Sequence, residues 1–175
     1  HPVAHSFPTR RSSDLSHLHD LGHERFVFAG LAGPYAWVDE RLQAFREALR
    51  SGDDEQVVML TPDSAANSRR CLRRALKTAT AVVAVNDELA EWALEVAAAM
   101  GKGVPEDVSV TGFDDDFRYR QLDLTTVNPG LEGLGCQAIQ LLGRLYAGEF
   151  KNQRVHLQVR PTLTVRHSTG PVAAG

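Results

Sequence analysis

Short apolar runs alternate with longer amphipathic segments along most of this chain, and no other feature constrains its fold as strongly. The apolar runs suit buried strands and occupy residues 25–30, 56–60, 80–85 and 108–111. Between them lie amphipathic segments with helical spacing, at residues 37–49, 65–78 and 87–100. Strands and helices that alternate through short loops form a parallel sheet with right-handed crossovers. We therefore predict an α/β fold, with a parallel sheet that carries helices on both faces.

The C-terminal part continues this pattern with one long amphipathic segment. Residues 124–127 form a brief predicted strand, and Pro129 lies in the first turn of a predicted helix that ends near Gly148. The apolar stripe of this helix consists of Leu131, Leu134, Ala138, Leu141, Leu142 and Leu145. Residues 154–159 and 162–165 follow as predicted closing strands.

Length and charge set the class of protein. The chain has 175 residues, and its 22 acidic and 19 basic side chains leave a net charge of −3. That length suits one domain, and the slight acidity excludes a protein whose whole surface binds nucleic acid, because phosphate binding needs surplus Lys and Arg. No apolar stretch is long enough to cross a membrane, and Cys71 and Cys136 form no zinc or disulfide pattern. We predict a cytoplasmic protein with no membrane partner.

The N-terminal segment differs from the rest, because residues 1–15 carry no helical or alternating apolar period. We predict that they are disordered. Residues 5–15 read H-S-F-P-T-R-R-S-S-D-L, which is identical to the translation of a common sequencing-library adapter. We interpret residues 1–15 as an artefact, so that natural sequence begins near Ser16 and its upstream part is missing. The alternative is a natural basic tail that contains Arg10 and Arg11.

Five motifs, collinear from about Leu18 to His167, resemble one known family. They are L-G-H-E-R-F from Leu21, D-E-R-L-Q-A-F-R-E-A-L from Asp39, A-V-N-D-E-L-A from Ala84, V-P-E-D-V-S-V-T-G-F-D-D from Val104 and L-T-T-V from Leu124. In this order they resemble the effector-binding domain of LacI/GalR-type bacterial transcription regulators. Each motif alone is moderately specific, whereas five in sequence are a strong indication.

The resemblance implies a two-lobed fold like that of type I periplasmic binding proteins, with a small effector in the cleft between the lobes. By that pattern, residues 25–123 and 154–167 build a C-terminal lobe, while residues 124–148 return to an N-terminal lobe that is mostly missing. The helix-turn-helix would be missing too, so operator DNA would be bound only through that absent domain. The resemblance also implies a homodimer in the full-length parent, and a sugar, polyol or nucleobase-like effector.

Ligands of open parallel sheets bind beyond the carboxyl ends of the strands, and two polar residues follow predicted strands there. Asp114 can accept hydrogen bonds from sugar hydroxyls, and in the family the first Asp of G-F-D-D contacts the effector. The alternative is that Asp114 or Asp115 only stabilises a turn after Gly112. Asn86 offers a donor and an acceptor to a ligand, but Asn is also a favoured N-cap. Both roles of Asn86 can coexist.

Arg41 occupies the arginine of the family's R-L-x-G-F-like helix start, where its guanidinium can point at ligand oxygens. The alternative is a surface arginine paired with Asp39 or Glu40. Family members often stack the effector on an aromatic ring after the second strand, but this chain has none there. Tyr35 or Trp37 would have to supply the ring. The predicted effector-binding set is Arg41, Asn86, Asp114, Trp37 and Asp115.

Other features have structural explanations that we prefer. One predicted helix has a basic face, which could attract phosphate but is more typical of a solvated surface. This face consists of Arg69, Arg70, Arg73, Arg74 and Lys77. His17, His19 and His23 include a pair at helical spacing, but no carboxylate or cysteine completes a metal site. Nucleotide-binding and hydrolase motifs are absent, and the adjacent acids at 114–116 diverge, so we expect no metal, no cofactor and no catalysis.

These observations favour a sensor, in which the effector shifts the population of lobe arrangements. In the complete protein, this shift would change the spacing of two DNA-reading heads. A periplasmic sugar-binding protein of a transport system is the first alternative, and an α/β enzyme acting on a sugar or sugar phosphate is the second. The helix at 129–148 lacks most of the lobe on which it would pack, so we expect an exposed leucine stripe and impaired folding of the fragment.

Overall fold

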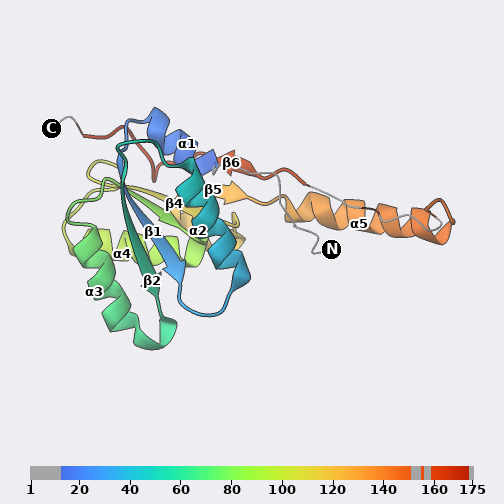
Figure 1. Ribbon diagram of the computed structural model, residues 1–175, viewed down its shortest axis with the longest axis horizontal. Coiled ribbons are helices and arrows are strands. Elements are labelled where there is room, and N and C mark those ends of the chain that lie inside the picture. The colour runs from blue at the N-terminus through green and yellow to red at the C-terminus, as the bar shows by residue number, and fades with distance from the viewer. Residues whose placement is uncertain (1–12, 151–154, 156–158, 174–175) are drawn as a thin grey trace.

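The computed structural model describes residues 13–150, 155 and 159–173. Within these residues, six strands form one sheet in the order β2-β1-β3-β4-β5-β6 (Figure 1). The strands are β1 (Arg25–Leu31), β2 (Asp54–Leu60), β3 (Ala81–Ala84), β4 (Ser109–Phe113), β5 (Thr125–Asn128) and β6 (Thr162–Thr164). The first five run parallel, and β6 pairs antiparallel with β5. The predicted α/β fold with a mainly parallel sheet is confirmed.

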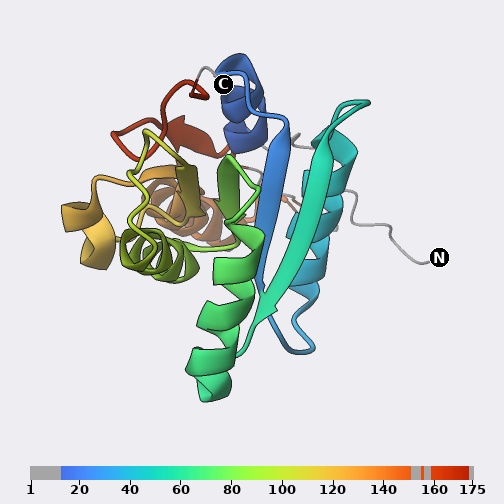
Figure 2. The same ribbon diagram turned by 90° about the vertical axis from the view of Figure 1, so that its left-hand side faces the viewer.

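Helices cover both faces of the sheet (Figure 2). One face carries α1 (Ser13–Asp20) and α2 (Ala36–Ala48), and the other carries α3 (Ala65–Ala75) and α4 (Asp87–Ala99). The chain steps from β1 outward to β2 and then returns past β1 to β3 and β4. Because each crossover is right-handed, this reversal of direction places α2 on the face opposite α3 and α4.

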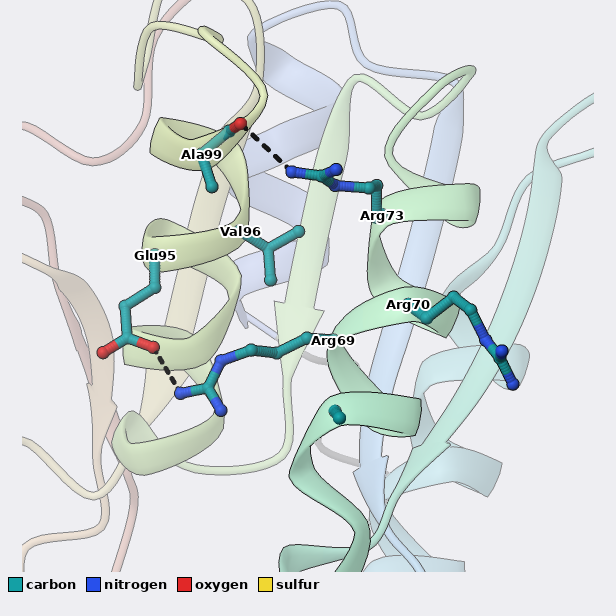
Figure 3. Close-up of a pocket in the computed structure, with 7 residues that line it drawn as sticks. Arg69, Arg70, Arg73, Glu95, Val96 and Ala99 are labelled. Atoms are coloured by element: carbon teal, nitrogen blue, oxygen red, sulfur yellow. Dashed lines mark hydrogen bonds and ion pairs between the residues drawn. The ribbon is translucent and has the colours of Figure 1, made fainter.

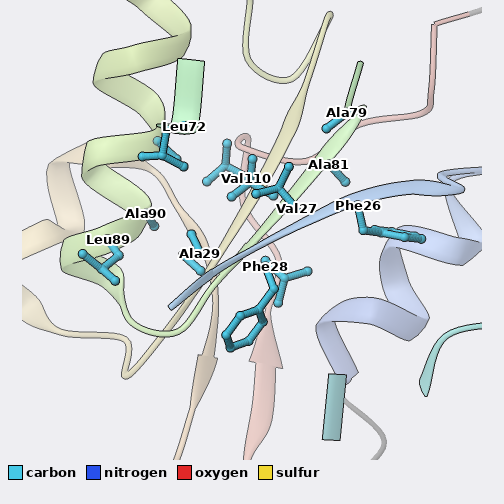
Figure 4. Close-up of a cluster of buried hydrophobic side chains, with 14 of the residues drawn as sticks. Phe26, Val27, Phe28, Ala29, Leu72, Ala79, Ala81, Leu89, Ala90 and Val110 are labelled. Carbon is cyan, nitrogen blue, oxygen red and sulfur yellow. The ribbon is translucent and has the colours of Figure 1, made fainter. Parts of the chain in front are cut away.

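The core is built on alternate residues of β1, which lies between two neighbouring strands. Phe26 and Phe28 point toward α1 and α2, and their rings lie 6.4 and 5.3 Å from that of Phe45. Leu72 and Leu89, from α3 and α4, are buried against the opposite face (Figure 4). Burial of a large apolar side chain contributes roughly 1.5–3 kcal/mol, so both faces hold the sheet between its helices.

Helix α1 begins earlier than the sequence suggested. It starts at Ser13, and Leu15 and Leu18 are fully buried in the core. The prediction of disorder is therefore wrong for residues 13–15, because packing of Leu15 against the core orders a turn that has no apolar period of its own. Residues 1–12 lie outside the described part of the chain.

The C-terminal strands also depart from the expected lobe boundaries. We expected residues 124–148 to leave this lobe together, but β5 pairs with β4 on one side and β6 on the other. Thr125 and Thr126 are buried, so the departing segment starts after Asn128. Most of the strand predicted at 154–159 lies outside the described residues, and Val159 itself is irregular.

Helix α5 (Leu131–Tyr146) projects away from the sheet (Figure 1). None of its residues is buried, and Ile139 and Tyr146 are 73% and 87% exposed. Within the predicted stripe, Leu131 and Leu142 are 63% and 54% exposed, so the exposure that we expected is confirmed for these two leucines. Among the described residues, no helix combines the length and apolarity that a membrane span requires.

Candidate ligand-binding site

The predicted ligand residues lie at the switch point of the sheet, where the strand order reverses. The neighbours of β1 are β2 and β3, so the loops that follow β1 and β3 leave toward opposite faces of the sheet. Such a switch point opens a crevice at the carboxyl ends of parallel strands. Helix α2 follows β1 and supplies Arg41, Asn86 follows β3, and Asp114 follows β4.

Arg41 bridges the loops after β3 and β4. Its Nη1 donates a hydrogen bond to the backbone carbonyl of Val85, and its Nη2 lies 3.6 Å from Asp114 Oδ1. The guanidinium carbon also lies 3.6 Å from the centre of the Phe113 ring, a distance at which a cation and an aromatic face attract each other. Its ion pair is thus with Asp114, rather than with the neighbouring acids of its own helix.

Asp114 presents its carboxylate at the edge of the sheet, with the side chain 42% exposed. Its backbone has φ of 116°, a region that costs a residue with a side chain about 1–3 kcal/mol and often marks a functional site. Burial raises the pKa of its carboxyl, while the nearby Arg41 guanidinium acts to lower it. Within the described residues, Arg41 is the only side-chain partner of this carboxylate, so its oxygens remain open to hydroxyl donors.

Asn86 is the N-cap of α4, and its side-chain oxygen accepts a hydrogen bond of 3.0 Å from the Leu89 amide. The capping role that we weighed against ligand contact is confirmed. Its amide nitrogen has no hydrogen-bond partner in the part of the chain that the structure describes. A donor therefore remains beside the Val85 carbonyl that Arg41 contacts, and ligand contact stays a prediction.

Trp37 lies beside Arg41, with the guanidinium carbon 5.0 Å from its ring centre. Its ring is 6.0 Å from that of Tyr35, and both side chains are exposed. The start of α2 thus places two rings next to the charged residues, Tyr35 as its N-cap and Trp37 in its first turn. Either ring is therefore placed where it can supply the stacking surface for an effector that the loop after β2 lacks.

Asp115 is paired with Arg166 and Asn128 rather than with Arg41. Its Oδ1 accepts a hydrogen bond of 2.6 Å from Arg166, and its Oδ2 accepts one of 3.0 Å from Asn128. Partial burial acts to raise the pKa of Asp115, but these two hydrogen bonds outweigh it and lower the pKa. Both oxygens are engaged within the protein, so the geometry favours the turn-stabilising role of Asp115 over ligand contact.

Three groups at this edge escaped the sequence analysis. The Val85 carbonyl and the Phe113 ring hold Arg41, and Asp87 is buried beneath the loop that carries Asp114. In the sequence, Asp87 is only the residue that directly follows the N-cap Asn86. An acid next to an N-cap is common, so nothing in the local pattern separates a buried acid from a solvated one.

The basic face of α3 borders a hollow of about 570 Å³ between α3 and α4 (Figure 3). Arg69 forms an ion pair of 2.6 Å with Glu95, and Arg73 donates to the Ala99 carbonyl at 3.1 Å. Arg70 bonds Asn67 on its own helix. These contacts between neighbouring helices support the structural explanation of the basic face. Arg41, Asn86 and Asp114 do not line this hollow.

His17, His19 and His23 have separate partners. His17 Nε2 lies 3.0 Å from Thr169 Oγ1, and His19 Nε2 lies 2.8 Å from Asp53 Oδ2. His23 is buried, and its Nε2 lies 3.0 Å from the Gly170 carbonyl oxygen. Their side chains fasten α1 and the turn after it to other elements.

Comparison with known proteins identifies relatives of this arrangement. The chain is 36% identical over 168 residues to the lactose operon repressor of Klebsiella pneumoniae, covering 91% of this chain and 46% of the repressor. A LacI family transcriptional regulator from Enterococcus faecium, solved with bound ribose, has a TM-score of 0.74 at 26% identity over 91% of this chain and 61% of that one. A complex of transcriptional regulator CelR with cellobiose has a TM-score of 0.70 at 30% identity, covering 88% and 49%.

The extent of the match establishes the family. The chain spans about half the length of the curated relatives that it matches. Residues 15–169 match the family described as "Periplasmic binding protein-like domain". The protein therefore belongs to the periplasmic binding protein-like domain family, and its relatives are LacI/GalR-type transcriptional regulators, as its motifs predicted.

Proposed function

We propose that this chain is the effector-sensing part of a LacI-type DNA-binding transcription regulator and that its effector is a sugar or a similar polyol. The observation that carries the proposal is the contact between Arg41 and Asp114, 3.6 Å apart at the switch point of the sheet, with Asn86 next to the carbonyl that Arg41 binds. Relatives with bound ribose and cellobiose support a sugar as the effector.

Each group has a distinct chemical role in this proposal. Asp114 accepts hydrogen bonds from adjacent hydroxyls, the Asn86 amide donates one, and Arg41 both orients Asp114 and binds ligand oxygens. The exposed ring of Trp37 covers an apolar face of the sugar. None of these groups is arranged to attack a bond, so we propose binding without catalysis, metal or cofactor.

Signalling requires parts of the protein beyond this sheet. An effector held against this edge would be closed in by a second wall, and it would favour the lobe arrangement that it binds better. We propose that the complete protein is a cytoplasmic homodimer, in which this shift alters operator binding by a separate DNA-reading domain. A transport-system binding protein has the same fold class, but the regulator is favoured because the relatives are transcriptional regulators.

The gene and its product distinguish these functions. Sequence upstream of this segment that encodes a helix-turn-helix supports the regulator, whereas a signal peptide supports the transport protein. With the full-length protein, operator affinity can be followed by fluorescence anisotropy during titration with D-ribose, cellobiose and further sugars. We expect at least one sugar to change operator affinity while being recovered chemically intact. A sugar that is converted to product would instead support an enzyme.

A further inference from the structure

Asp87 is a buried carboxylate that the proposed ligand contacts do not use. It is the first residue of α4 and only 2% exposed. Its Oδ1 accepts a hydrogen bond of 2.6 Å from the Thr126 hydroxyl, and its Oδ2 accepts one of 2.8 Å from the Asp116 amide. Within the described residues, no cation is paired with it. Burial of a carboxylate costs free energy unless it is hydrogen-bonded. The two hydrogen bonds offset this cost, and the groups that donate them indicate what Asp87 does.

The loop after β4 is fixed by its backbone amides. The amide of Asp114 donates to the Val127 carbonyl at 2.9 Å, that of Asp115 to the Thr126 hydroxyl at 3.4 Å, and that of Asp116 to Asp87 at 2.8 Å. Asp87 and Thr126 also bond each other, so they hold two successive amides as one unit.

This anchoring coincides with an unfavourable backbone conformation. Asp114 and Asp115 have φ of 116° and 52°, positive values that residues with side chains adopt rarely. Asp87 also fits closely against β4, because a Cβ added at Gly112 would lie 2.3 Å from its Oδ1. The loop that presents Asp114 is thus shaped by contacts that lie beneath it.

We propose that Asp87 is a positioning residue, which acts with Thr126 to hold the loop after β4 so that Asp114 faces Arg41. Asp87 also directly follows Asn86, so one buried side chain couples two of the predicted ligand groups. The inference rests on the proposed function only in naming Asp114 as a ligand group. The positioning itself is measurable without any ligand.

The test uses ¹⁵N NMR and amide hydrogen exchange on the 175-residue chain. In Asp87→Ala, we expect the Asp116 amide to exchange at least tenfold faster, and the Arg41 Nε–Hε signal to move toward its position in Asp114→Ala. In Asp87→Asn, which keeps an acceptor for the Asp116 amide, we expect exchange within about threefold of wild type. These two variants therefore separate the lost hydrogen bonds from the lost charge.

Two further variants keep the proposal falsifiable if Asp87→Ala folds poorly. Thr126→Val removes the hydroxyl that bonds both the Asp115 amide and Asp87, so it should speed exchange at Asp115 and move the Arg41 signal in the same direction as Asp87→Ala, while leaving the sheet core intact. Asp107→Ala removes another carboxylate that accepts a backbone amide, that of Gly103 at 2.7 Å, and should leave the Arg41 signal unchanged.

The outcomes are distinct from those of the functional test. The proposal is overturned if Asp87→Ala leaves the Asp116 amide and the Arg41 signal as in wild type. It is also overturned if exchange rises equally at Phe28 in β1, because that would show general destabilisation. A sugar screen without any binding would contradict the proposed function, but it would leave these NMR results unaffected.

Discussion

Helices α4 and α5 both carry an apolar stripe, but only α4 buries it. Helix α4 lies on the sheet and buries Leu89, Ala90, Ala93, Val96 and Ala97. Helix α5 is longer and also amphipathic, but none of its residues is buried. The difference shows that apolar residues at helical spacing specify a helix and its apolar face. Whether that face is buried depends on which other elements the fold places against it.

The largest effect should come from a matched pair of leucine truncations. Leu89→Ala in α4 removes a buried side chain and should lower the free energy of unfolding by about 2–5 kcal/mol. Leu142→Ala in α5 removes one that is 54% exposed and should change it by less than about 0.5 kcal/mol. Urea denaturation measures both values. Equal losses in the two variants would show that α5 packs against the rest of the chain in solution.

A moderate effect is expected at the sheet edge, where Asp114 has an unfavourable backbone. Asp114→Gly accepts φ of 116° without strain and should stabilise the chain by about 1 kcal/mol at pH 7. Burial raises the pKa of Asp114, so its contribution to stability is fully present below the unfolded pKa and is lost as pH rises through the folded pKa.

The gain from Asp114→Gly should therefore be larger at pH 7 than at about pH 3, below the pKa of an unfolded aspartic acid. Denaturation of both proteins across this pH range measures the difference. A gain that is the same at every pH would show that strain alone is relieved and that burial does not penalise the ionised carboxylate.

The smallest effect on stability should come from an exposed apolar side chain of α5 outside its predicted stripe. Ile139→Lys places a charge where the side chain is 73% exposed, so the free energy of unfolding should change by less than about 0.5 kcal/mol. Self-association should fall, because exposed apolar patches promote it. Light scattering as a function of concentration tests this, and unchanged association would exclude Ile139 as its cause.

The sequence predicted those parts of the fold that depend on local pattern. Residues that are neighbours in the chain are enough to predict the apolar strands, the N-cap at Asn86 and the strand or helix that each predicted ligand residue follows. The position of β5 did not, because four residues fit either lobe until their pairing partners are known. The role of Asp115 depends on Arg166, which lies 51 positions away.

The same reasoning explains the different positions of Asp87, which is buried, and Asp114, which is partly exposed. Asp87 and Asp114 each follow a strand by a few residues, and local pattern marks both as polar residues in a loop or helix start. Only the tertiary structure shows that Asp87 points inward to Thr126 while Asp114 meets Arg41. Long-range contacts thus decide which carboxylate is presented and which is an anchor.

The most direct test of the account is a thermal-shift screen of the full-length protein with D-ribose, cellobiose, other sugars and nucleobases. The wild type is compared with Asp114→Ala, and with Asp107→Ala as the matched control. We predict that at least one sugar raises the melting temperature of the wild type and the control but not that of Asp114→Ala. A shift that persists unchanged in Asp114→Ala would remove Asp114 from the site and contradict the central claim.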